Sequence, residues 1–422
     1  MKLSKHRKSK TSTCKAIPAV ACASDAPPNA QGQKRKRATS QKKPAATTTA
    51  IKRPAAAKPK SKVEKAPKKP SETVLGGTEK TTQFPAALSL ASDCSGVGTE
   101  RLAAVLAFGH RSAINHNYTS EISEACRTFL KHFVKPKFVA SDIDNQIPGD
   151  WAAHSDYYVC GYPCQPWSGA GSQEGLADPE GRGMVMSKVP RQIAKMKPRA
   201  YVLENVMGFV QRFPKVFNTL VEALRALELE PYRGPSYNVY WDVLSADAHG
   251  GVPQHRERIF IIGIKRSEQV RHFEWPTRLP GCLTLDDCLG CGSNPPVPES
   301  ILHGKTLKNA FARLKAKLAQ NGPDGQDCIC DTGSSNGTVM VGKSPCLTAS
   351  GCESFRFYSN RRGRWLNCND FAALQGVPPN AFPDWQKIVS EKDYAHMLGN
   401  AINVQVLKRI FVQIARARGW QC

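Results

Sequence analysis

The sequence lacks any aromatic residue before Phe84 and has no apolar run of about 18 residues. Without such a run we predict no membrane span. The first residues are basic but lead into no short apolar stretch, so we expect no secretory signal. The chain nevertheless holds 15 cysteines. In a chain without that signal, we expect reduced thiols in the cytosol or nucleus rather than a disulfide framework.

The positive charge is concentrated at the start of the chain. Residues 1–70 contain 20 lysines and arginines against 2 acidic residues, a net charge of +18 out of +24. Lacking aromatic residues, the segment 1–80 cannot bury enough apolar surface to offset its ordering entropy, so we predict disorder. Clusters of lysine and arginine at 34–37 and 52–53 suggest a nuclear import signal. The lysine-rich composition of this segment suits binding to DNA phosphates or chromatin. We therefore expect a nuclear protein whose tail contacts an import receptor or chromatin; a generic solvated polycation is the plainer alternative.

The folded body is expected to begin near Ala86. Residues 87–93 read as a buried strand, 94–99 as a glycine-rich turn and 100–108 as a helix, an arrangement that lets backbone approach a nucleoside cofactor. Further predicted strands and helices alternate along the chain, which predicts a doubly wound α/β sheet. The strands are 138–140, 157–159, 200–203, 236–244 and 259–264, and the helices are 123–133, 184–196 and 213–227.

Cys164 is the candidate nucleophile. It lies just past a predicted strand, between Pro163 and Pro166, whose fixed φ angles stiffen the loop. Open α/β sheets place their chemistry at such strand ends. A small buried hydrophobic residue is the more frequent role of a cysteine.

Three acids follow predicted strands or precede predicted helices. Glu121 suits two ribose hydroxyls and Asp142 an adenine amino group, whereas Glu204 ends a strand parallel to the one before Cys164. A carboxyl and a thiol at one sheet edge could act as acid and nucleophile. Taken singly, each acid could instead be a helix cap or a solvated charge. Arg256 and Arg258 share a face if extended and suit an anion; an exposed charge pair is the alternative.

Residues 265–345 are rich in glycine, proline and polar residues, with one helical stretch at 306–319. This composition predicts a small irregular domain. Five cysteines here raise a zinc alternative, but they lack paired Cys-x2-Cys units, so we predict no metal site. They are Cys282, Cys288, Cys291, Cys328 and Cys330.

Taken together, the motifs resemble the C5-cytosine DNA methyltransferases in order and spacing over roughly residues 86–418. The resemblance rests on the glycine turn at 93–98, the Gly-Tyr-Pro-Cys-Gln-Pro-Trp-Ser loop at 161–168 and Glu-Asn-Val at 204–206. It extends to Gln-His-Arg-Glu-Arg at 254–258, Ser-Pro-Cys-Leu-Thr at 344–348, Leu-Gln-Gly-Val-Pro at 374–378 and Gly-Asn at 399–400.

The resemblance implies a DNA (cytosine-5) methyltransferase that uses S-adenosylmethionine, acts on double-stranded DNA and flips its target base. It implies a catalytic domain at 86–264, completed by 346–422, with a target-recognition domain at 265–345. The catalytic residues would be Cys164, Glu204, Arg256 and Arg258, with Gln165, Ser168 and Gln254 binding substrate. The cofactor residues would be Ser95, Gly96, Gly98, Glu121, Ile122, Asp142, Ile143, Asn400 and Ile402.

Two positions depart from the family pattern. Cys94 and Ile122 stand where the family often has aromatic residues, which leaves less aromatic packing for the adenosyl group. A tRNA cytosine-5 methyltransferase and a catalytically weak chromatin-binding relative are the alternatives. A nucleotide-binding dehydrogenase is disfavoured, because Arg101 occupies the third glycine position of its Gly-x-Gly-x-x-Gly signature.

Overall fold

The computed structural model describes residues 83–145, 155–169, 171, 173–231, 233–292, 305–321, 327–333 and 337–421. The basic tail at 1–80 lies outside the described residues, so its predicted disorder, import signal and DNA contacts stay predictions. Among the described helices, none combines the length and hydrophobicity needed to cross a membrane.

The centre of the fold is a seven-stranded sheet in the order β3-β2-β1-β4-β5-β7-β6. Neighbouring strands pair in parallel, except that β7 runs antiparallel to both β5 and β6. The predicted α/β class with a mainly parallel sheet is confirmed. The strands are β1 (Ala87–Asp93), β2 (Ala113–Ser120), β3 (Phe138–Ala140), β4 (Tyr157–Cys160), β5 (Ala200–Val206), β6 (Tyr237–Ser245) and β7 (Glu257–Lys265).

Strand order places a topological switch point between β1 and β4. From β1 the chain adds β2 and β3 on one side, and it then returns to add β4 and β5 on the other. Where successive connections leave in opposite directions, a crevice opens at the carboxyl ends of the two central strands. The glycine turn follows β1 and the Cys164 loop follows β4, so both predicted motifs lie at this switch point.

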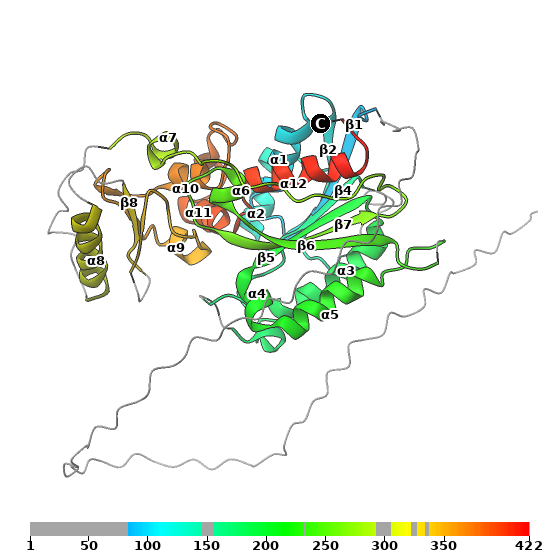
Figure 1. Ribbon diagram of the computed structural model, residues 1–422, viewed down its shortest axis with the longest axis horizontal. Coiled ribbons are helices and arrows are strands. Elements are labelled where there is room, and N and C mark those ends of the chain that lie inside the picture. Colours follow the sequence, from blue (N-terminus) through cyan, green and yellow to red (C-terminus); the bar gives the residue numbers. More distant parts are fainter. Residues whose placement is uncertain are drawn as a thin grey trace, which may run out of the picture. The chain divides into compact units, whose positions relative to one another are not determined.

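Alternating side chains of the sheet supply two separate cores. Val202 of β5 belongs to the core shared with α1, α2 and α12, whereas its neighbour Tyr201 belongs to the core shared with α3, α4 and α5. Strand periodicity requires this, because successive side chains point to opposite faces. Figure 1 shows the two helical layers on either side of the sheet. The helices are α1 (Thr99–Phe108), α2 (Glu124–Phe129), α3 (Val185–Met196), α4 (Met207–Arg212), α5 (Pro214–Arg225) and α12 (Val404–Ala417).

A smaller antiparallel sheet has the order β11-β10-β8-β9. Its strands come from both sides of residue 345, so the expected domain at 265–345 does not contain this sheet completely. They are β8 (Cys328–Asp331), β9 (Thr338–Val341), β10 (Phe357–Ser359) and β11 (Arg364–Trp365). Helix α8 (Lys305–Asn321) contributes Phe311 and Leu314 to the small core, together with Cys328 and Cys330 of β8. Within the described ranges, no three His, Cys, Asp or Glu side chains gather as a metal-binding group.

Five further α-helices belong to the described fold. They are α6 (Ala246–Gly250), α7 (Leu285–Leu289), α9 (Ala349–Glu353), α10 (Cys368–Leu374) and α11 (Glu391–Asn400). The predicted helix at 123–133 is divided into α2 and a π-helical turn at Leu130–Val134, which ends at Lys135 in the left-handed conformation.

The sheet provides a stability test at Gly263 of β7, which pairs directly with Tyr201 of β5. A Cβ added at Gly263 would overlap the buried Tyr201 ring. Gly263→Ala should therefore cost about 1–3 kcal/mol of unfolding free energy, as overpacking does, measured by denaturant unfolding. Gly281→Ala is the matched control, because a Cβ there meets nothing within 4 Å. Equal stability of the two variants would contradict the packing described here.

Candidate functional site

The turn after β1 exposes backbone at the crevice. Cys94, Gly96 and Gly98 have φ values of 54°, 52° and 73°, a left-handed region that favours glycine. A Cβ at Gly96 would meet nothing within 4 Å, whereas one at Gly98 would collide with Val134. The backbone of Gly96 therefore borders open space. The missing side chain of Gly98 allows the start of α1 to lie close to Val134, just before the turn at Lys135.

Glu121 is joined to this turn at the end of β2. Its carboxylate accepts hydrogen bonds from the Gly96 N–H at 2.8 Å and the Ser123 N–H at 3.0 Å. A carboxylate has about four lone-pair sites, so acceptor capacity remains for two hydroxyls. The next side chain, Ile122, is 77% exposed, an unusual position for a large apolar residue. Carboxylate, open backbone and exposed apolar surface thus meet at one place.

The remaining predicted cofactor residues occupy neighbouring elements. Ser95 lies in the turn itself, and its hydroxyl bonds to Ser92 at 2.7 Å. Asp142 follows β3, whose Ala140 carbonyl accepts from the Glu121 N–H at 3.1 Å, and Ile143 is buried. Asn400 is exposed at the end of α11. Ile402 lies 3.4 Å from the position of a Gly161 Cβ, so the segment after α11 borders the Cys164 loop.

The Cys164 loop is fixed from both sides. Its Trp167 is fully buried against Phe209 of α4, with ring centroids 4.6 Å apart. The Asn205 side chain of β5 donates to the Tyr162 carbonyl at 3.0 Å. The Cys164 carbonyl accepts from the Trp167 and Ser168 N–H groups at 3.0 and 2.9 Å. The stiff loop predicted from the two prolines is thus anchored by tertiary contacts as well.

Glu204 lies at the same sheet edge as the Cys164 loop. Cys160, the last residue of β4, pairs with Leu203 of β5. Glu204 is the next residue of β5, so it lies level with the start of the Cys164 loop. Arg258 of β7 lies opposite Val206, and its Nε is 3.0 Å from Glu204 Oε1. Burial raises the pKa of Glu204 above its ordinary value, although the Arg258 and Arg256 charges oppose that rise. A carboxyl with a raised pKa can act as a proton donor near neutral pH.

Cys164 belongs to the same electrostatic cluster and is half-buried. Burial raises the pKa of its thiol, the positive charge of Arg258 lowers it, and the negative charge of Glu204 raises it again. The net direction of the pKa shift is upward. Arg258, and to a smaller extent Arg256, therefore favours the Cys164 thiolate, and Arg258 simultaneously pairs with the Glu204 carboxyl.

Arg256, predicted as catalytic, and Gln254, predicted to bind substrate, are both held by backbone groups. Arg256 donates to the Leu347 and Ala401 carbonyls at 2.7 and 2.8 Å and is 3% exposed. Gln254 is fully buried; its amide donates to the Leu374 carbonyl at 2.8 Å and accepts from the Leu347 N–H at 3.2 Å. Through these backbone contacts both side chains join segments of the site, and the predicted substrate role of Gln254 stays a prediction.

Gln165 and Ser168, the other predicted substrate residues, lie in the Cys164 loop. The Gln165 side-chain oxygen is buried and has no hydrogen-bond partner within the described part of the chain. A buried acceptor without a partner costs free energy, which a ligand donor could recover. Ser168 is half-buried at the end of the same turn.

A buried polar cluster beneath the glycine turn was missed by the sequence reasoning. Glu100 of α1 accepts from the Ser92 hydroxyl at 2.9 Å, and the same hydroxyl contacts His116 Nε2 at 2.9 Å. Burial raises the pKa of Glu100 to about 7 and lowers that of His116 to about 3. A polar residue in the first turn of a helix is ordinarily read as solvated, so the local sequence carried no signal of this burial.

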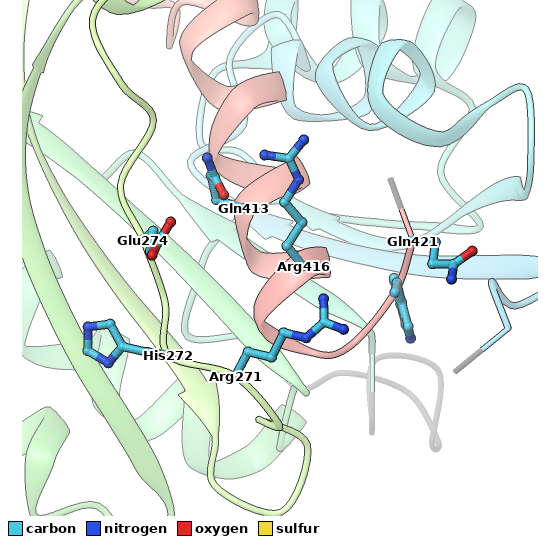
Figure 2. A pocket seen from close by; sticks show the side chains of 7 residues that line it. Arg271, His272, Glu274, Gln413, Arg416 and Gln421 are labelled. Carbon is cyan, nitrogen blue, oxygen red and sulfur yellow. The ribbon is translucent and has the colours of Figure 1, made fainter. Parts of the chain in front are cut away.

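A separate hollow of about 460 Å³ lies between the segment after β7 and the end of α12. Figure 2 shows the polar side chains on its wall, including Arg271, Glu274 and Arg416. None of the predicted site residues lines it. It is therefore distinct from the crevice at the ends of β1 and β4.

The Glu100 cluster predicts a pH-dependent stability. The folded pKa of about 7 exceeds the ordinary 4.5, so the folded state binds more protons between these pH values and stability falls as pH rises through this window. The full loss is about 3 kcal/mol. Glu100→Gln, whose amide does not ionise, should lose less stability between pH 5 and 8 in thermal unfolding than the natural chain. Exposed Glu222→Gln is the control, and identical pH profiles for Glu100→Gln and Glu222→Gln would contradict the assignment.

Comparison with known proteins agrees with this geometry. Residues 89–416 match the family described as C-5 cytosine-specific DNA methylase. The type II methyltransferase M.HgiCII of Herpetosiphon aurantiacus is 33% identical over 172 residues, 39% of this chain and 37% of the relative. Two other type II methyltransferases are each matched over 46% of their own length. The chain therefore spans less than half the length of several curated relatives that it matches. M.FnuDI of Fusobacterium nucleatum is 28% identical over 358 residues, 76% of this chain and 91% of the relative.

Solved structures show the same fold. A protein described as a prophage-encoded DNA modification methyltransferase of E. coli has a TM-score of 0.52 at 18% identity, covering 78% of this chain and 99% of its own. The family uses S-adenosylmethionine as methyl donor. The family match begins within β1 and ends within α12, so it spans the central sheet. The chain therefore belongs to the C-5 cytosine-specific DNA methylase family.

Proposed function

We propose that this protein is a DNA (cytosine-5) methyltransferase that forms a covalent bond between Cys164 and its target base. The observation that carries the proposal is the cluster of Cys164, Glu204 and Arg258 at the ends of neighbouring strands. The anchored loop presents the thiol, and Arg258 pairs with Glu204 at 3.0 Å. The glycine turn and Glu121 border the same crevice at the switch point.

The residues at the switch point fit S-adenosylmethionine. Glu121 has free acceptor capacity for ribose hydroxyls, the open Gly96 backbone admits close approach, and exposed Ile122 offers apolar surface. Asp142, Ile143, Asn400 and Ile402 would complete the cofactor site from the neighbouring elements. When bound, S-adenosylmethionine supplies a sulfonium methyl group for transfer to cytosine C5.

Cys164 would act first, because cytosine C5 is a poor nucleophile. Addition of the Cys164 thiolate to C6 forms an S–C6 bond and shifts the ring electrons, which makes C5 enamine-like. Glu204 would hydrogen-bond or protonate N3 and draw charge from the ring during the attack. The raised pKa of Glu204 favours the protonated form that this role needs. After methylation, loss of the C5 proton allows the S–C6 bond to break and releases Cys164.

A base inside a duplex cannot reach a half-buried thiol, so the target cytosine must leave the stack, as methyltransferase substrates do. Arg258 would hold the flipped base through its O2 while keeping Glu204 oriented; Arg256 would position the segments around it. The small sheet and residues 265–345 would read the neighbouring DNA.

Covalent trapping tests the nucleophile. On duplex DNA with 5-fluorocytosine at the target and S-adenosylmethionine present, methyl transfer gives an adduct that cannot eliminate, because fluorine cannot leave as a proton, so the adduct should survive denaturation. Cys164→Ser should abolish the adduct, since a serine hydroxyl is far less nucleophilic at neutral pH. Glu204→Gln should slow trapping about 100-fold or more, with DNA binding nearly unchanged. Gel electrophoresis of the denatured complex gives the readout.

Cys160→Ser is the matched control, because Cys160 is fully buried in the core beneath the loop. It should form the adduct normally if it remains folded. An adduct in Cys164→Ser, or none with the natural chain across candidate duplexes, would overturn the assignment. Repeating the assay with 5-fluorocytosine in tRNA tests the RNA alternative.

The cofactor assignment is tested at Glu121. Glu121→Ala should weaken S-adenosylmethionine binding by about 1–2 kcal/mol, the size of a hydrogen bond to a charged group, measured by titration calorimetry. Glu124→Ala, an exposed carboxylate three residues along, should bind as the natural chain does. Unchanged binding in Glu121→Ala would remove Glu121 from the site, and thermal unfolding of both variants checks that the fold survives the change.

The basic tail is proposed as an accessory for nuclear delivery and DNA affinity. A chain starting at Thr81 should keep turnover on a short duplex at low salt and show a shallower salt dependence of DNA binding, because fewer phosphates are neutralised. A tail fused to a fluorescent protein should enter nuclei. Loss of turnover in the truncated chain would contradict the accessory role.

A further inference from the structure

A second sulfur lies in the catalytic centre. Cys346 Sγ is 3.5 Å from Arg258 Nη2 and 3.7 Å from Arg256 Nη1. The proposed reaction uses the Cys164 thiol and leaves Cys346 without a role. Arg258 therefore lies between Glu204 and Cys346 and contacts both.

The position of Cys346 is set by backbone contacts. The Ser344 N–H donates to the Pro253 carbonyl at 2.7 Å, and the His255 N–H donates to the Ser344 carbonyl at 2.9 Å. Gln254 accepts from the Leu347 N–H at 3.2 Å. The segment containing Cys346 is thus attached to the segment containing Arg256 and Arg258, and the contact between sulfur and arginines needs no substrate.

The two thiols experience the arginines differently. Burial alone would raise the pKa of Cys346, but the charges of Arg258 and Arg256 outweigh it and lower the pKa below its ordinary value. The pKa of Cys164 is raised, mainly by burial. The thiolate is the reactive form, and the contacts of both guanidiniums with the Cys346 sulfur favour that form in Cys346. Cys346 is also half-buried, whereas Cys160 and Cys352 are fully buried.

We propose that Cys346 is a second reactive thiol of the catalytic centre, a modification site for small soft electrophiles that reacts ahead of Cys164. With a haloacetamide, the Cys346 sulfur forms an S–C bond as the carbon–halogen bond breaks and halide leaves. With hydrogen peroxide, the sulfur forms an S–O bond as the O–O bond breaks; cysteine is oxidised to the sulfenic acid and peroxide is reduced to water.

Modification at Cys346 has a consequence for the proposed reaction. An added group prevents ionisation of the Cys346 sulfur, which contacts Arg258, and occupies space beside the pair of Arg258 and Glu204. Methyl transfer should then fall while Cys164 is still unmodified. This loss of methyl transfer rests on the proposed function, but the labelling of Cys346 does not.

The direct test is limited alkylation of the full chain with iodoacetamide at pH 7, followed by peptide mass spectrometry. Cys346 should be labelled about tenfold or more faster than Cys164, because labelling follows the thiolate fraction, and faster than exposed Cys282. Labelling of Cys164 or Cys282 at an equal or higher rate would overturn the proposal. Since the readout is a mass on a peptide, an inactive protein would not obscure the result.

Two variants test whether Arg258 causes the reactivity of Cys346 and whether that reactivity is independent of Cys164. Arg258→Gln should slow Cys346 labelling several-fold at pH 7. At pH 9.5 labelling should return to the natural rate, because the thiol ionises there without the arginine; an unchanged rate at pH 7 would overturn the role of the arginine.

Cys164→Ser, a near-isosteric change, should leave Cys346 labelling at the natural rate, and loss of labelling there would overturn independent reactivity. Arg361→Gln, which alters an arginine paired with Asp286, is the charge-matched control.

Discussion

The contact between Arg258 and Glu204 is the interaction on which the site depends. It joins β7 to β5 across a strand pair, with side chains 14% and 9% exposed. Buried charges persist only when they are paired and hydrogen-bonded, because desolvation is costly. Removing Arg258 would therefore leave the buried Glu204 carboxyl without its ion-pair partner and would also remove the charge that lowers the Cys164 pKa most. The Arg258 guanidinium thus acts on the pKa of one carboxyl and of two sulfurs, together with Arg256 and against the effect of burial.

The antiparallel strand β7 makes this contact possible. A parallel strand at that position would present its carboxyl end to the crevice, whereas β7 brings its first residues there. Arg258 thereby lies opposite Val206 and reaches Glu204 diagonally, the spacing at which long side chains on neighbouring strands meet. Arg256 donates hydrogen bonds to backbone carbonyls in the segments after β9 and after α11. These bonds hold both segments against the same edge of the sheet.

Much of the sheet and the loop could be predicted from sequence. The strands at 87–93 and 138–140 and the rigid Cys164 loop carry local signals, namely apolar runs, glycine breaks and proline constraints. The adjacency of Cys164 and Glu204 followed from the parallel pairing of their strands. The burial of Gln254 and Glu100 and the position of Cys346 beside the arginines could not be predicted in this way, because each depends on contacts made by residues far away in the chain. The same limit applies to the small sheet, which combines strands from both sides of residue 345.

The chemistry itself is tested most directly by following the hydrogen at C5. A duplex carrying cytosine tritiated at C5 should release tritium to water in step with methyl incorporation, because the covalent route requires that hydrogen to leave before Cys164 does. The covalent mechanism predicts equal amounts of tritium released and methyl transferred by the natural chain, and neither by Cys164→Ser. Methyl incorporation with tritium retained, or release by Cys164→Ser at the natural rate, would contradict it.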